Sequence, residues 1–148
     1  MQDKIFKLVE KRLFSYLPSC KRLKKMHCEL EILQSSSSVH SQNLNSVASQ
    51  VIGHSDPVGE RVDKIDTAER KFYKFLKFLT PVTRLICDLK NAHILDTVKS
   101  VYYLTILEHY YFRKKSVQDI LKITHWSRRA FYSRRYELVC QAREYMRL

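Results

Sequence analysis

Glycine and proline are scarce along this chain, with two glycines and three prolines in 148 residues. All-β architectures need many turns, and glycine and proline are among the residues that turns use most. Long stretches are instead rich in Leu, Lys, Arg, Glu and Ile, which favour helices. We therefore expect an all-α protein whose helices are joined by few tight turns, and its 45% hydrophobic content is enough for a core.

The chain is strongly basic, because 27 Lys and Arg against 15 Asp and Glu leave a net charge of +12 at pH 7. Residues 101–148 hold half of that excess, with 10 basic against 4 acidic side chains. Such a field attracts polyanions, either nucleic acids or acidic lipid surfaces. No run reaches the roughly 18 apolar residues of a membrane span, and no secretory signal is recognised. We expect a cytoplasmic protein that binds nucleic acid and no membrane.

The N-terminal region, residues 1–34, has the pattern of two amphipathic helices. Residues 4–17 place apolar and basic side chains on opposite sides of a helix, and Pro18 is expected to break it. Ser19 then suits the N-cap of a second helix that runs to about Gln34. This pattern predicts an N-terminal helical hairpin, in preference to a dimerising coiled coil, which needs sustained heptads.

Two further regions follow the hairpin. Residues 35–59 contain no Lys or Arg and many Ser, which predicts a flexible linker. Residues 60–148 resume helical periodicity and are expected to form a helical domain. Within it we predict a helix over 60–79 that ends at Pro81, a helix from Pro81 to a bend at 91–93, and an aromatic helix over 96–112.

The segment 116–144 has the pattern of a helix-turn-helix. Ser116 and Asp119 fit a capping box at the start of a short helix, a turn is expected at 124–126, and Ser127 suits the N-cap of a second helix. The inward residues of that second helix are predicted to be Ala130, Phe131, Leu138 and Ala142.

The outward residues of the second helix are rich in arginine and predict a DNA-reading surface. The first turns of a recognition helix enter the major groove, where Arg bonds guanine edges and nearby polar groups hold phosphates. Tyr136 is expected at or near the outer face, and Arg134 is the position that the helix angle can turn toward the core. The expected base or near-base contacts are Arg128, Arg129, Tyr132 and Ser133, and the expected phosphate contacts are Ser127, Arg134, Arg135, Lys114, Lys115 and Lys122.

The stretch Ser127-Arg-Arg-Ala-Phe-Tyr-Ser-Arg-Arg-Tyr-Glu-Leu-Val139 resembles the second-helix signature of ArpU/RinA-type phage late-gene transcriptional regulators. In that resemblance Ser127 matches the cap, Arg129 the expected arginine, Phe131 the buried apolar position and Tyr132 the expected tyrosine. The layout of the whole chain is also similar. The resemblance implies a helix-turn-helix like region 4 of sigma factors, in a protein that activates packaging and lysis genes of a phage in the bacterial cytoplasm.

The turn departs from the family pattern. His125 stands where the family usually has Gly, Thr124 where it has Leu, and Ala130 where it has Thr. A non-Gly residue with a positive φ is uncommon, although His is among the tolerated types, so we expect the turn to be reshaped or shifted by a residue. Trp126 beside it is expected to pack as a lid rather than to stack on a sugar of the DNA.

Other classes of function have weaker support. No phosphate loop or hydrolase motif is present, so we expect no enzyme, no cofactor and no metal. A magnesium nuclease built on Asp63, Asp66 and Glu69 is conceivable, although such acids more often solvate the start of a helix. Cys20, His27 and Cys28 lack the paired spacing of a zinc site. The main alternative is a helical interaction module that binds RNA polymerase, another protein or a second copy, with only non-specific affinity for nucleic acid.

Overall fold

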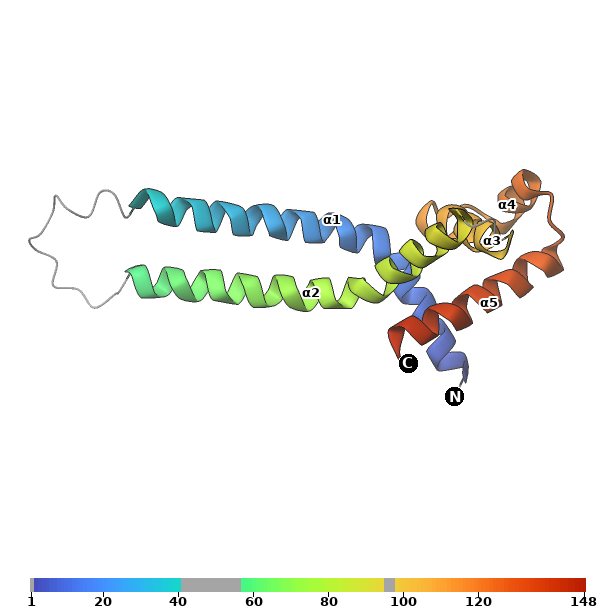
Figure 1. The fold of residues 1–148 in the computed structure, drawn as a ribbon, viewed down its shortest axis with the longest axis horizontal. Helices are drawn as coiled ribbons and strands as arrows, with labels where there is room; N and C mark the ends of the chain where they lie inside the picture. The colour runs from blue at the N-terminus through green and yellow to red at the C-terminus, as the bar shows by residue number, and fades with distance from the viewer. Residues whose placement is uncertain (1, 41–56, 95–97) are drawn as a thin grey trace, which may run out of the picture. The chain divides into compact units, whose positions relative to one another are not determined.

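The computed structural model describes residues 2–40, 57–94 and 98–148, and in these ranges it contains helices and no strands (Figure 1). The all-α prediction is confirmed. No helix in these ranges combines the length and the apolar character that crossing a bilayer needs. The elements are α1 (Gln2–His40), α2 (Pro57–Ile94), α3 (Val98–Ile106), the π-helix η1 (Leu107–Phe112), α4 (Val117–Thr124) and α5 (Arg128–Met146).

The chain divides into two compact units that do not follow the predicted boundaries. Unit 1 consists of Met1–Ser19 and Leu79–Leu148, and unit 2 consists of Cys20–Phe78. Helices α1 and α2 each contribute to both units. The predicted division at residues 34 and 59 is therefore replaced by one that cuts through two long helices.

The predicted N-terminal helical hairpin is wrong, because residues 2–34 belong to the single helix α1, which passes through Pro18. A proline inside a helix removes a backbone hydrogen bond and costs about 3 kcal/mol. The helix continues because apolar side chains on both sides of the proline are packed. Val9 and Leu13 are fully buried before it, and Leu23 and Met26 are half-buried after it.

The predicted helix end at Pro81 is wrong for the same reason. Helix α2 continues through Pro81 with Leu79 and Val82 buried on either side, and it also passes the expected bend at 91–93. The helices also extend into the predicted linker, since α1 includes residues 35–40 and α2 begins at Pro57. The rest of that prediction, residues 41–56, lies outside the described residues.

The aromatic segment changes its helix type within unit 1. α3 gives way at Leu107 to a π-helix, and the N–H of Arg113 donates to the carbonyl oxygen of Glu108 at 2.9 Å. In a π-helix each turn holds more residues than in an α-helix. Ile106, Leu107 and Tyr111 are all buried here. The prediction of one α-helix over 96–112 is therefore corrected to an α-helix followed by a π-helix over 98–112. Residues 96 and 97 of that prediction lie outside the described residues.

Unit 1 holds the hydrophobic core of the described chain. The start of α1, the end of α2 and all later helices contribute to it, so segments from both ends of the sequence pack together. Its buried apolar side chains are Val9, Leu13, Leu79, Val82, Leu85, Leu89, Ile106, Leu107, Tyr111, Ile120, Phe131, Leu138, Val139, Ala142 and Met146.

Unit 2 is an antiparallel pair formed by the later part of α1 and the earlier part of α2 (Figure 1). The Gln34 amide donates to Glu69 at 2.9 Å, and the Arg22 guanidinium lies 5.4 Å from the ring centroid of Phe75. None of its side chains that the structure describes is buried. Two helices cover each other on one stripe only, and their remaining surface stays exposed.

Candidate nucleic-acid interface

Helix α4 begins with Ser116 as its N-cap, as predicted, while the Asp119 carboxylate bonds the Ser116 hydroxyl and not the backbone N–H of a capping box. The Ser116 hydroxyl accepts from the backbone N–H of Asp119 at 3.2 Å and donates to its carboxylate at 2.6 Å. These bonds satisfy a backbone N–H group that the first turn of a helix leaves without a partner. Ile120 is then buried in the core, which fixes the rotation of this short helix.

The turn between α4 and α5 consists of three residues, His125, Trp126 and Ser127. The predicted turn at 124–126 is thus displaced by one residue, and His125 is left-handed, with φ 55° and ψ 26°, which a histidine tolerates. The Ser127 hydroxyl accepts from the backbone N–H of Ala130 at 3.2 Å, which confirms the predicted N-cap of α5. Both caps and the left-handed residue are local features; the sequence predicted the two caps and left the backbone geometry at His125 open.

The inner face of α5 joins the core. Phe131, Leu138 and Ala142 are fully buried as predicted, whereas Ala130 is half-buried. Sequence reasoning missed Val139 and Met146, although both continue the three- and four-residue spacing from Ala142.

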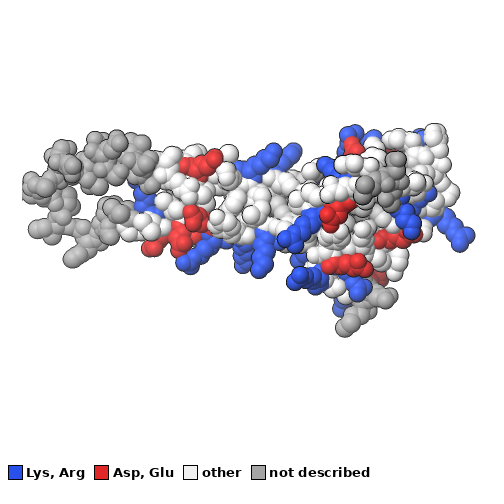
Figure 2. All heavy atoms as spheres, in the orientation of Figure 1, with Lys and Arg blue, Asp and Glu red and all other residues white. Residues whose placement is uncertain are grey.

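The outer face of α5 carries the predicted base-contact residues. Arg128, Arg129 and Ser133 are exposed, and Tyr132 and Tyr136 keep 44% and 56% of their surface accessible. Ser127 is exposed as well. Figure 2 shows basic side chains projecting from unit 1, to which α5 belongs. The first two turns of α5 therefore present two guanidinium groups and a phenol to solvent. Arg129 lies on the side opposite the buried Phe131, whereas Arg128 and Tyr132 lie beside it at the edge of the core.

Glu137 limits this surface toward the C-terminal end of α5. Its carboxylate accepts from the Tyr103 hydroxyl at 2.9 Å and lies 3.4 Å from the hydroxyl of Ser133. Desolvation of the ring, followed by the bond to Glu137, raises the pKa of Tyr103 to about 12. A negative charge held at this position repels phosphate, so the basic surface ends near Ser133.

The three predicted lysine contacts lie before and within α4. Lys114 and Lys122 are exposed, and Lys115 is half-buried. Lys114 has a φ of 54°, and the backbone N–H of Lys115 donates to the carbonyl oxygen of His109 at 2.9 Å. The segment that carries the two neighbouring lysines is thus anchored to η1.

Arg134 lies against aromatic rings, not at the predicted phosphate position. Its guanidinium carbon is 3.6 Å from the ring centroid of Tyr102 and 4.3 Å from that of Trp126, and the two rings meet edge to face. Cation–π contacts of this kind contribute about 0.5–2 kcal/mol each. The packing role predicted for Trp126 is confirmed, and we reassign Arg134 to the support of the turn.

Arg135 also faces inward, where it binds an acid near the other end of the sequence. Its Nε and Nη2 donate to one carboxylate oxygen of Glu10 at 2.8 and 2.5 Å, and the Tyr111 hydroxyl donates to the same oxygen at 2.7 Å. The side chains of Arg135 and Glu10 are only 18% and 14% exposed. Burial, followed by the bond to Glu10, raises the pKa of Tyr111. We therefore reassign Arg135 from phosphate contact to the fold.

Sequence reasoning missed Glu10, and its signal was weak. It is the single acid between Asp3 and Glu29 in a basic stretch, and it directly follows the buried Val9. Its partner is 125 residues away, which no local pattern reveals. Around the interface and across the rest of the described chain, no three His, Cys, Asp or Glu side chains gather closely enough to hold a metal ion.

The chain matches no protein-family model, no curated protein and no solved structure.

Proposed function

We propose that this chain is a sequence-specific regulator of transcription that reads double-stranded DNA, with α4 and α5 as a helix-turn-helix. The observation that carries the proposal is the two-sided start of α5. Arg128, Arg129 and Tyr132 are exposed in its first turns, while Phe131 in the same turns is fully buried in the core.

The chemistry of this surface suits the major groove. An arginine can donate two hydrogen bonds to the O6 and N7 atoms of guanine, and each such pair discriminates by about 1–3 kcal/mol. The helix N-terminus adds a partial positive charge that favours a phosphate. Arg128 and Arg129 are the proposed base readers, with Tyr132 and Ser133 beside them.

The phosphate contacts are a smaller set than the sequence predicted. Arg134 and Arg135 are engaged within the protein, which leaves Ser127, Lys114, Lys115 and Lys122. Phosphate contacts fix the register of a protein on DNA and make its affinity depend on salt. We expect a shallower salt dependence than all six predicted contacts would give.

The regulatory role is supported by the resemblance to ArpU/RinA-type regulators. That resemblance implies activation of phage packaging and lysis genes, and an activator needs contacts with a partner such as RNA polymerase. In this proposal the outer face of α5 selects the promoter, and another surface contacts the polymerase.

The test is selection from a library of short duplexes at several salt concentrations. We expect the wild-type chain to enrich one sequence. On that sequence R128A/R129A should lose on the order of 2–6 kcal/mol of binding free energy, with little loss on random DNA. The control R84A/K90A removes the same charge from exposed positions on α2 and should change both affinities equally.

Binding that is weak, steep in salt and indifferent to sequence would overturn this proposal. The net charge would then act only as a general field. A helical protein-interaction module would be the better description, and unit 2, which has no buried side chain in its described part, favours that second candidate.

A further inference from the structure

Unit 2 separates its charges along its length. One half, formed by residues 20–28 of α1 and 70–78 of α2, contains no acid and eight basic side chains: Lys21, Arg22, Lys24, Lys25, Arg70, Lys71, Lys74 and Lys77. The half nearer residues 35 and 59 carries Glu29, Glu31, Glu60, Asp63, Asp66 and Glu69 against Arg61 and Lys64. On the hairpin in Figure 2, acidic side chains gather next to the grey segment and basic ones farther along.

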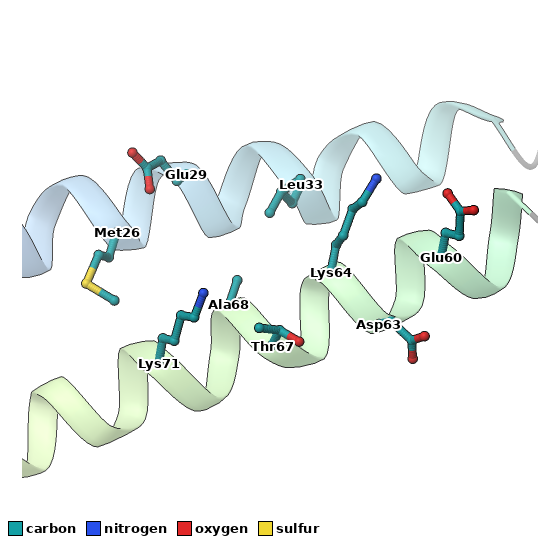
Figure 3. A pocket seen from close by; sticks show the side chains of 9 residues that line it. All are labelled: Met26, Glu29, Leu33, Glu60, Asp63, Lys64, Thr67, Ala68 and Lys71. Atoms are coloured by element: carbon teal, nitrogen blue, oxygen red, sulfur yellow. The ribbon is translucent and has the colours of Figure 1, made fainter.

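One face of unit 2 is also hollowed along its length. A hollow of about 560 Å³ lies beside Met26, Glu29, Leu33 and Ala68, and a second of about 410 Å³ lies beside Arg22, Met26 and Phe75. Both hollows share Met26 and Lys71, so they form one groove. In Figure 3, Met26 and Leu33 point from α1 toward α2, while Lys64 and Lys71 reach back toward α1.

The floor of this groove is apolar and its ends have opposite charge. Met26, Leu33, Ala68 and Phe75 are only half-buried, although each lines the groove. Glu29 borders the acidic part and Arg22 the basic part. A surface with an apolar floor and two oppositely charged ends is complementary to itself when a second copy is turned end to end.

We propose that this groove is the contact between two copies of the chain, whose units 2 pack antiparallel as a four-helix bundle. The two-fold axis passes near Met26 and Lys71. Glu29 lies about 4.5 Å from Met26 along α1, and Arg22 lies about 6 Å away in the other direction, at 1.5 Å per residue. The axis therefore brings Glu29 of each copy opposite Arg22 of the other.

The same axis brings a large side chain opposite small ones on α2. Along α2, Phe75 lies about 6 Å from Lys71 in one direction, and Thr67 and Ala68 lie about 4.5–6 Å from it in the other direction. The two-fold axis therefore places Phe75 of one copy over Thr67 and Ala68 of the other. The ring then enters the larger hollow. A two-helix unit without buried side chains in its described part acquires a core in this way, as the helices of a four-helix bundle do.

This inference goes beyond the proposed DNA binding and rests on different residues, so it is tested without DNA. Sedimentation equilibrium of the full chain should show a reversible dimer. E29R and R22E should each raise the dimer dissociation constant by at least about tenfold, because both symmetric ion pairs become repulsive. E31R makes the same charge change outside the groove and should leave the constant within about threefold.

Mixing the variants gives the decisive result. E29R with R22E restores both attractive pairs in a heterodimer, so the mixture should dimerise more tightly than either variant alone. In a chain whose four cysteines are changed to Ser, M26C should form a disulfide-linked dimer on mild oxidation, since Met26 meets its own copy near the axis. Circular dichroism checks that each variant keeps its helices.

Three results would overturn the proposal. The wild-type chain could remain monomeric throughout the micromolar range. The charge variants could dimerise as tightly as the wild type, which would place the contact on another face. The mixture of E29R and R22E could show no preference for the heterodimer, which would exclude the antiparallel pairing.

Discussion

Units 1 and 2 are both built from amphipathic helices, yet only unit 1 buries side chains among the described residues. In unit 1 each helix packs against more than one neighbour, and two polar contacts, at Glu10 and Arg134, are enclosed as well. In unit 2 two helices share one stripe. An amphipathic pattern thus predicts which side of a helix turns inward, while the number of neighbouring helices decides how much of the helix surface is buried.

The largest expected difference between the units lies in their aromatic residues. F131A should lower the free energy of unfolding by about 3–5 kcal/mol, because it leaves a cavity under fully buried atoms. The matched change F72A removes a half-buried ring in unit 2 and should cost about 1–2 kcal/mol. Urea denaturation followed by circular dichroism measures both. Equal losses would contradict the difference in packing.

The loss of an ion pair should also lower the free energy of unfolding more in unit 1 than in unit 2, by a smaller difference than the loss of an aromatic ring. E10Q removes the charge that Arg135 and Tyr111 share in an enclosed site, and we expect a loss of about 2–4 kcal/mol. D66N removes the exposed pair with Arg70 in unit 2 and should cost less than about 1 kcal/mol. If E10Q proved as mild as D66N, Arg135 would be free to move to a phosphate.

The smallest expected effect is a loss of stability of unit 1 at alkaline pH. The hydrogen bond to Asp88, followed by burial, raises the pKa of Tyr145 to about 12, and the pKa of Tyr103 is raised to the same value. These raised values mean that the folded state holds the phenolic protons more tightly, so their contribution is complete below about pH 10 and is lost toward pH 12.

Denaturation midpoints between pH 9 and 12 measure this effect. The double variant Y103F/Y145F should show a shallower decline than the wild type across that range, since it has lost two of the titrating groups. An identical decline would mean that these two hydroxyls do not contribute to the alkaline loss.

Local features of the sequence were predictable and long-range ones were not. The caps at Ser116 and Ser127 depend on neighbouring residues, and the structure has both of them. The two arginines that turned inward depend on Tyr102 and Glu10, which are distant in the sequence. A helix position alone cannot show whether an arginine faces solvent or a buried acid.

The errors at the prolines have the same origin. Pro18 and Pro81 are strong local signals for the end of a helix, but buried or half-buried apolar side chains on both sides of each site keep the helices continuous. The structure therefore has no hairpin within residues 2–34; the helical hairpin that it does have is unit 2, which pairs the later part of α1 with the earlier part of α2. Tertiary packing outweighed the local penalty.

The most direct test of the account compares the outer and inner arginines of α5 by measuring DNA affinity and unfolding free energy on the same variants. We expect R128A/R129A to lose affinity for the selected duplex and to keep its stability within about 0.5 kcal/mol, because both side chains are exposed. R135A should instead lose about 3–5 kcal/mol of stability, since Glu10 is left without its cation. Unchanged affinity in R128A/R129A would contradict the central claim that the outer face of α5 reads DNA.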